Sequence, residues 1–141
     1  MMTIAEIEAE IRDEFAMFDD WEDRYNYLID LGKDLPLIDP GKKTEERIIK
    51  GCQSRVWLDA ESREGRIDFT ADSDAIITKG LISLLVRVLS HQKAEDIVAT
   101  ELKFIDDIGL REHLSPTRSN GLVSMIHQMK RYAAGYLASK A

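Results

Sequence analysis

Apolar residues recur at helical spacing in two segments near the start of the chain and predict two helices there. The first segment follows Thr3, which is spaced to form a capping box with Glu6. The second follows Asp20, a residue type that caps helices well, and ends at Gly32. The apolar positions are Ile4, Ile7, Ile11 and Phe15 in the first segment and Trp21, Tyr25, Leu28 and Ile29 in the second.

In the middle of the chain the pattern changes to strict alternation, which is typical of strands with one buried face. A loop rich in proline and glycine covers 35–41, and the short segment Arg47–Lys50 is the first candidate strand. Apolar and polar residues then alternate over 56–59 and again over 67–70, with a turn predicted over 61–65. These three segments predict a small antiparallel meander.

The second half of the chain is predicted to be helical. Residues 76–89 are apolar around most of the helix circumference, so this helix is expected at the centre of the core. Either Ser73 or Asp74 is placed to cap it. The remaining predicted helices cover 94–99, 102–108 and a long C-terminal stretch that begins at Ser115-Pro116, where serine suits the cap and proline the first position.

The order of these elements is α-α-β-β-β-α-α-α, which predicts the α+β class, with helices over one face of a three-stranded antiparallel sheet. We find no internal repeat, no low-complexity segment and no composition shift that would mark a domain boundary. Residues 1–141 are therefore expected to form a single domain.

The charge of the chain is unevenly distributed. Its net charge is −7, and residues 1–40 hold twelve acidic and three basic residues. Nucleic acid is not expected as a partner, because phosphate binding needs a basic surface. The acidic segment is read as a solvated face or as a surface that steers a basic protein partner. No apolar run reaches the ~18–20 residues of a membrane span, so no membrane association is expected.

Cys52 is the only cysteine in the chain, so an internal disulfide is impossible. It lies in Gly51–Ser54, just before the first alternating strand, a position that presents a thiol, although burial is the commonest fate of a free cysteine. An unperturbed thiol has a pKa of ~8.5, and the nearby Lys50 and Arg55 are expected to lower it. The three histidines have no zinc-ligand spacing, so no metal site is expected. A lone cysteine and no signal-like N-terminus predict a cytoplasmic protein.

Around Cys52 the chain resembles the SufE/CsdE family, the sulfur acceptors that work with cysteine desulfurases in iron–sulfur cluster assembly. The motif Gly51–Trp57 carries the resemblance, and three further blocks at family-like spacing extend it over nearly the whole chain. These blocks are 21–36, 71–81 and 113–122.

The resemblance implies a fold like that of the IscU scaffolds, with Cys52 at a loop tip. It implies that Cys52 accepts sulfane sulfur as a persulfide from a pyridoxal-phosphate-dependent cysteine desulfurase of the SufS/CsdA kind. A scaffold complex of the SufBCD kind would then receive the sulfur. Gly51, Gln53, Asp74 and Arg118 match positions that support the loop or the partner contact. No cofactor is implied for this chain, which can be a monomer or a homodimer.

Three alternatives remain open at this point. The chain can be a CsdE-type carrier that feeds another sulfur-transfer pathway, because the motifs do not separate the two branches. It can be a stand-alone thiol enzyme, although the absence of a second, resolving cysteine argues against this. It can also be an interaction module in which Cys52 is inert.

Overall fold

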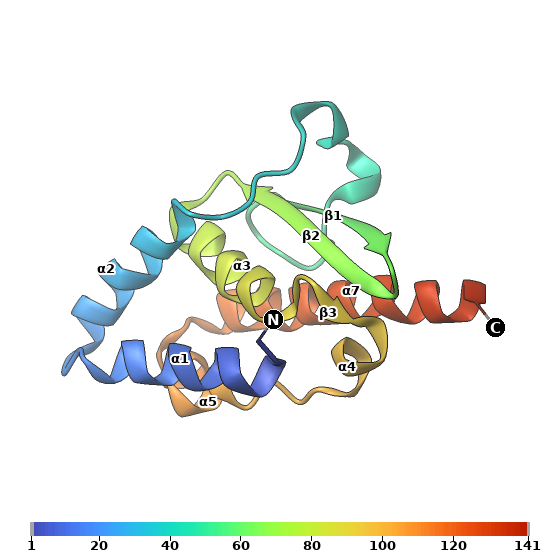
Figure 1. Ribbon diagram of the computed structural model, residues 1–141. Coiled ribbons are helices and arrows are strands. Elements are labelled where there is room, and N and C mark those ends of the chain that lie inside the picture. Colours follow the sequence, from blue (N-terminus) through green and yellow to red (C-terminus); the bar gives the residue numbers. More distant parts are fainter. Residues whose placement is uncertain (1, 141) are drawn as a thin grey trace.

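The computed structural model describes residues 2–140 and confirms the α+β class. The β1–β2 hairpin lies over α3 and α7, and α1 and α5 lie on the side of α3 away from the sheet (Figure 1). The strands are β1 (Val56–Arg63), β2 (Arg66–Ser73) and β3 (Gln92–Lys93). The helices are α1 (Ile4–Ala16), α2 (Trp21–Gly32), α3 (Ile76–Leu89), α4 (Ala94–Ala99), α5 (Phe104–Asp107), α6 (Leu110–His113) and α7 (Pro116–Lys140), with 3-10 turns η1 (Pro40–Lys42) and η2 (Glu45–Arg47).

The β1–β2 hairpin is longer than the alternating pattern predicts. Its strands stay paired from Val56↔Ser73 to Arg63↔Arg66, so the turn contains only Glu64 and Gly65. Both turn residues have positive φ, 54° and 81°, as a type I′ turn requires. This turn matches the right-handed twist of the strands and holds the hairpin in one register.

The strand predicted at Arg47–Lys50 is wrong, and the third strand of the sheet lies elsewhere. Arg47 belongs to η2, and Ile48 makes only an isolated bridge to Trp57. The third strand is instead β3, which follows α3 and pairs with the hairpin end of β2. Two residues are too few for any periodicity, so β3 could not be read from the sequence. The strand order β1-β2-β3 leaves β1 at one edge of the sheet.

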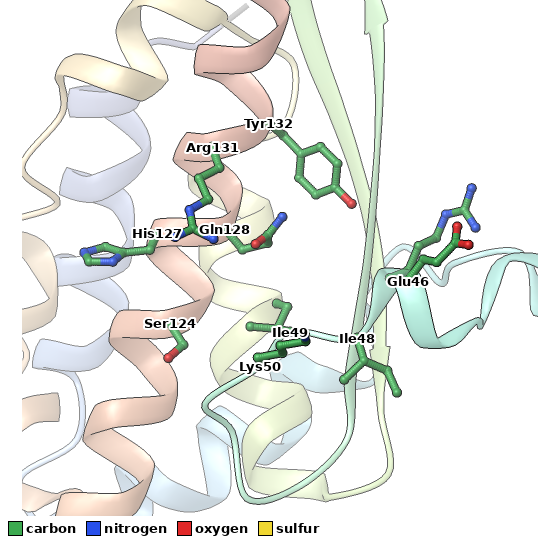
Figure 2. A pocket seen from close by; sticks show the side chains of 10 residues that line it. Glu46, Ile48, Ile49, Lys50, Ser124, His127, Gln128, Arg131 and Tyr132 are labelled. Carbon is green, nitrogen blue, oxygen red and sulfur yellow. The ribbon is translucent and has the colours of Figure 1, made fainter.

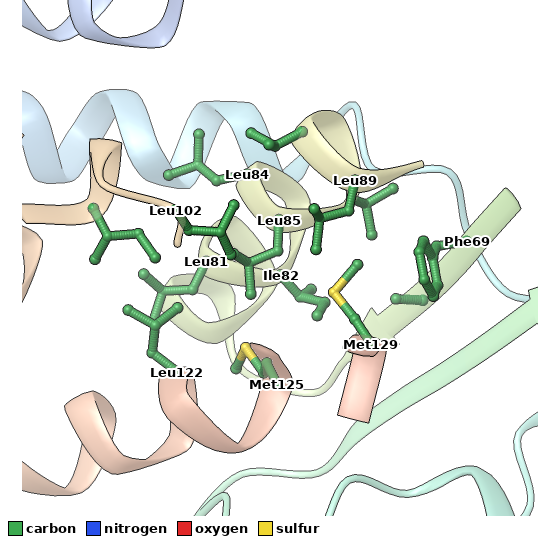
Figure 3. Close-up of a cluster of buried hydrophobic side chains, with 14 of the residues drawn as sticks. Phe69, Leu81, Ile82, Leu84, Leu85, Leu89, Leu102, Leu122, Met125 and Met129 are labelled. Carbon is green, nitrogen blue, oxygen red and sulfur yellow. The ribbon is translucent and has the colours of Figure 1, made fainter. Parts of the chain in front are cut away.

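Helix α3 lies at the centre of the core, as its apolar circumference predicts. Its side chains contact β2 on one side and α1, α2 and α7 on the others. Neither predicted cap is correct, because Ala75 is the N-cap residue and no side chain caps the helix. Ser73 and Asp74 bind the loop before β1 instead. Figure 3 shows the buried cluster of Phe69, Leu81, Ile82, Leu84, Leu85, Leu89, Leu102, Leu122, Met125 and Met129.

Helices α2 and α3 cross with their backbones in contact. A Cβ placed on Gly80 would lie 2.4 Å from the carbonyl oxygen of Leu28, and one on Gly32 would lie 3.0 Å from the Gly80 nitrogen. Gly32 is the last residue of α2, as predicted. The structure gives a further reason for glycine there, because two residues without side chains allow this close crossing.

A partly buried ion pair ties α1 to α3. Arg87 donates two hydrogen bonds to the carboxylate of Glu14, which also accepts one from the Tyr27 hydroxyl. The bond from Arg87 lowers the pKa of Glu14. Burial, followed by the bond to Glu14, raises the pKa of Tyr27 to about 12. Across the neutral pH range Glu14 and Arg87 therefore stay charged and Tyr27 stays neutral.

Replacing Glu14 by glutamine is expected to reduce the free energy of unfolding at neutral pH by ~1 kcal/mol, since the pair is only partly buried. The pKa of Glu14 is lowered in the fold, so its contribution is full above the unfolded pKa of ~4.3 and is lost as pH falls through the folded pKa. Urea unfolding between neutral and acidic pH measures this. The two proteins should converge in acid. Glu10→Gln is the control. Glu10 lies 4.0 Å from Arg87, farther than Glu14, so its replacement should change the free energy of unfolding less.

Candidate functional site around Cys52

The candidate site is the loop that joins Ile49 to β1 and carries Cys52 at its centre. The Ile49 amide donates to the Val56 carbonyl at 2.8 Å, which closes the loop at its base. Cys52 is half-buried, and its thiol donates to the carbonyl of Gly121 on α7 at 3.6 Å. The loop therefore rests against the N-terminal half of α7, with the sulfur turned toward the helix.

Gly51 lets the loop come this close to α7. Its φ is +96°, which side chains disfavour, and a Cβ there would lie 2.4 Å from the Ser124 hydroxyl. On the helix side, a Cβ on Gly121 would lie 3.5 Å from the sulfur of Cys52. Gly51 is thus required by both its conformation and its surroundings, and it fixes the direction in which Cys52 points.

Cys52 lines a cavity of about 70 Å³ between the loop, α3 and α7. Two other predicted site residues, Gln53 and Arg118, line the same cavity. A guanidinium nitrogen of Arg118 donates to the Tyr25 hydroxyl at 3.3 Å, which holds this cation between α7 and α2. The remaining lining residues are Ser54, Thr78, Leu81, Thr117, Gly121 and Met125.

Asp74 lies outside this cavity and acts on the other end of the loop. Its carboxylate accepts a hydrogen bond from the Arg55 amide at 3.1 Å. The Asp74 amide and the Ser73 hydroxyl donate to the Arg55 carbonyl, at 3.3 and 2.8 Å. These bonds clamp the C-terminal end of the loop to the end of β2, so Asp74 supports the loop without touching the thiol.

Burial raises the pKa of the Cys52 thiol. The prediction that Lys50 and Arg55 lower it is therefore wrong for this conformation. Both residues are exposed, where solvent screens their charge, while the sulfur is half-buried. In the conformation seen here the thiol is protonated at neutral pH and is a poor nucleophile.

We expect the rate of Cys52 alkylation by iodoacetamide to rise with pH around a midpoint above the ~8.5 of a free thiol. Rates measured from neutral to alkaline pH, in native buffer and in urea, test this. The urea-unfolded chain should return to the ordinary midpoint. Lys50→Gln should leave the native midpoint unchanged, because burial is the cause. A native midpoint at or below that of the unfolded chain would contradict the expectation.

Sequence reasoning missed the part of the site that α7 contributes. Gly121, Ser124 and Met125 lie one turn apart on the helix face that contacts the loop. Both Gly121 and Met125 stand in the predicted C-terminal helix, but nothing in their spacing indicates a contact with the Cys52 loop. A glycine inside a long helix costs stability, so it was the one available signal for a close contact there.

Neither a metal centre nor a membrane-spanning helix is found in the part of the chain that the structure describes. Within residues 2–140, no group of three or more His, Cys, Asp and Glu side chains is arranged to hold a metal ion. None of the helices in the same range has the length and apolar character needed to cross a membrane.

Comparison with known proteins identifies the family. Residues 9–133 match the SufE family, described as an Fe-S metabolism associated domain. An uncharacterized SufE-like protein of Rhizobium meliloti (strain 1021) is 41% identical over 133 residues, which cover 91% of this chain and 95% of that protein. Another, of Rhizobium etli, is 40% identical over 129 residues, covering 88% and 87%. The chain therefore belongs to the SufE family, which gives it a role in iron–sulfur metabolism.

A solved structure confirms the fold independently. The solution structure of a hypothetical protein from Thermus thermophilus matches with a TM-score of 0.77, over 94% of this chain and 96% of that one. The two sequences are only 20% identical, so the likeness concerns the fold alone.

Proposed function

We propose that this protein accepts sulfane sulfur from a pyridoxal-phosphate-dependent cysteine desulfurase, carries it as a persulfide on Cys52, and passes it to an iron–sulfur scaffold complex. The observation that carries the proposal is the placement of the only cysteine, at a loop tip above a small polar-rimmed cavity in a SufE-family fold. A lone thiol suits a carrier, because the donor protein supplies the second sulfur.

The transfer needs one nucleophile on this chain. The Cys52 thiolate attacks the terminal sulfur of a persulfide on the desulfurase, which forms a sulfur–sulfur bond on Cys52. The sulfur–sulfur bond in the desulfurase breaks, and its cysteine leaves as a thiolate. One sulfur atom moves with no net oxidation or reduction, and no metal or cofactor on this chain takes part.

The cavity supports a resting place for the transferred sulfur. Its volume of about 70 Å³ exceeds the ~10–15 Å³ that a cavity needs, on the corresponding measure, to hold one water molecule. A sulfur atom is of comparable size, so the persulfide fits beneath the loop. Arg118 and Gln53 line the cavity and would supply a positive charge and an amide donor to the persulfide anion.

Transfer also requires that the loop leave α7, because the thiol turned toward the helix is half-buried and protonated. Within residues 2–140 the tip has one hydrogen bond, from the Cys52 thiol to Gly121, besides the packing of Gly51 on Ser124 and of Cys52 on the core, whereas stronger hydrogen bonds hold both ends of the loop. Docking of the desulfurase would therefore move the tip outward and return the thiol pKa toward its ordinary value.

Intact-mass spectrometry tests the proposal. The protein is mixed with a cysteine desulfurase and L-cysteine, and its mass is measured before and after treatment with a reductant. We expect a gain of one sulfur atom that the reductant removes, and none when L-cysteine is left out. No gain with several desulfurases that are active alone would overturn the proposal and favour the inert-module alternative.

A further inference from the structure

A groove that the mechanism above does not use runs along α7 from the base of the Cys52 loop. It consists of two adjoining hollows of about 330 and 380 Å³ that share Gln128, Arg131 and Tyr132. The first hollow lies between α7 and residues 46–50, and Figure 2 shows Lys50 on one wall and Ser124 and His127 on the other. The second lies between α7 and residues 60–62 of β1.

The second hollow is bounded by the free edge of β1 and by Ile67 of the neighbouring strand β2. The Ile49 amide donates to the Val56 carbonyl at 2.8 Å, and the Tyr132 hydroxyl donates to the Leu58 carbonyl at 3.3 Å, so both carbonyls point away from β2. In an antiparallel ladder the backbone N–H and C=O groups of alternate residues point to the same side. Those of Ala60 and Ser62 therefore also point away from β2. No backbone group within residues 2–140 bonds to these two residues on that side.

The chain itself shows that this edge accepts an extended segment. Ile48 forms an antiparallel bridge with Trp57, but the residues just before Ile48 form η2 and do not continue along the edge. Pairing along the edge therefore stops after its first residues, although β1 continues to Arg63. The rest of the edge offers unpaired donors and acceptors to another extended segment.

Gly135 is the second observation that points to a ligand. It lies inside α7 and lines the hollow beside β1. Glycine inside a helix is less favourable than alanine. A Cβ on Gly135 would meet nothing within 4 Å, and its φ is not positive. The packing and backbone of this chain therefore do not require a glycine at this position, and the space over it is open to an occupant of the groove.

The charge of the groove indicates the chemistry of that occupant. Lys50 and Arg131 line it and form no ion pair with any residue in the range 2–140. Arg47 is already bound to Asp59, and Glu46 lies at the rim away from α7 (Figure 2). Glu61, which lines the second hollow, is already paired with Lys42. The two cations without an ion pair in this range, on a chain of net charge −7, therefore favour a segment that carries carboxylates.

We propose that this groove receives an extended, acidic segment of the cysteine desulfurase, which adds a strand to β1 at Ala60 and Ser62 and places carboxylates beside Lys50 and Arg131. The inference rests on the proposed function, because it assigns the partner's docking element. The groove ends at the base of the Cys52 loop. An occupant would therefore lie beside the loop whose tip must move outward for sulfur transfer.

Affinity for a cysteine desulfurase tests the groove directly. Gly135→Gln adds a long side chain at the wall of the hollow, where its Cβ meets nothing within 4 Å, and replaces glycine by a better helix former. We expect it to weaken binding at least about tenfold. Ala134→Gln is the matched control, since Ala134 is exposed and does not line the groove, and it should bind like the natural protein. Binding by Gly135→Gln within about twofold of the natural protein would overturn the proposal.

Two further measurements separate an extended acidic occupant from other contacts. Amide hydrogen exchange at Ala60 and Ser62 should slow in the complex, and unchanged exchange would rule out strand addition. Arg131→Glu should weaken binding more than Lys93→Glu, which makes the same charge change at β3, on the far edge of the sheet. Equal effects would contradict an acidic segment.

The outcome for the groove can be distinguished from the outcome for Cys52. If the natural protein and Gly135→Gln gain sulfur on Cys52 equally and bind the desulfurase equally, the groove proposal fails and the carrier function stands. If the natural protein binds through the groove but never gains sulfur, the carrier function fails and the docking site stands. If it binds no desulfurase that is active alone, both fail.

Discussion

Replacing Cys52 by serine is expected to abolish the gain of sulfur from a cysteine desulfurase and the associated stimulation of its turnover. A serine hydroxyl cannot form the persulfide, and the chain has no other thiol to replace it. The substitution exchanges one small polar atom at a half-buried position, so the free energy of unfolding should change by less than ~1 kcal/mol. Intact mass, alanine release by the desulfurase and urea unfolding measure the three quantities.

Ser54→Ala is the matched control for this experiment. Ser54 lies in the same loop and lines the same cavity but carries no thiol. It should keep sulfur transfer close to that of the natural protein. The carrier role would be refuted if Cys52→Ser still stimulated the desulfurase fully. That result is what an interaction module with an inert cysteine predicts.

Gly80→Ala is expected to give the largest loss of stability, at least ~2 kcal/mol. The new methyl group would lie 2.4 Å from the Leu28 carbonyl oxygen and 3.0 Å from the carbonyl carbon. These are backbone atoms that cannot rotate away, so α2 and α3 must separate. The separation outweighs the ~1 kcal/mol that alanine gains over glycine in a helix. Thermal or urea unfolding measures the change.

Gly135→Ala is the natural comparison, because it makes the same chemical change inside another helix. Its methyl group meets nothing within 4 Å, so it should stabilise the protein by up to ~1 kcal/mol. The two variants should therefore shift the unfolding midpoint in opposite directions. A stability loss of similar size in both would mean that helix propensity and packing had been assigned incorrectly.

Patterns that depend on neighbouring residues were readable from the sequence. The Thr3 hydroxyl and the Glu6 carboxylate bind each other's backbone amides, as the capping box predicts. The Ser115 hydroxyl accepts from the Arg118 amide at the start of α7. The alternation over the hairpin placed Val56 and Phe69 in the core correctly.

Features set by contacts between distant segments were not readable. Ile48 and Ile49 have strand-like side chains, but the residues just before them form η2, so only one bridge forms. Strand β3 exists because His91, with a φ of 67°, turns the chain after α3 and its amide donates to Ile67. No local pattern encodes either event.

The candidate site divides in the same way. The position of Cys52 before a strand follows from the local sequence, and the loop does lie there. Its protonation does not, because the pKa depends on α7, which comes about 70 residues later and covers the sulfur. The charges of Lys50 and Arg55 were visible in the sequence, whereas the burial that outweighs them was not.

The two fixed ends of the Cys52 loop limit how far its tip can move. Cys52 is three residues from Ile49 and three from Arg55, both of which are bound to the sheet or its ends. Three extended residues span at most about 11 Å. However far the loop tip moves, the Cys52 sulfur stays within a short radius of the β1 edge. If Cys52 carries sulfur as proposed, the donor must bring its own sulfur into that small volume, and exchange is confined to partners that bind closely on this one face.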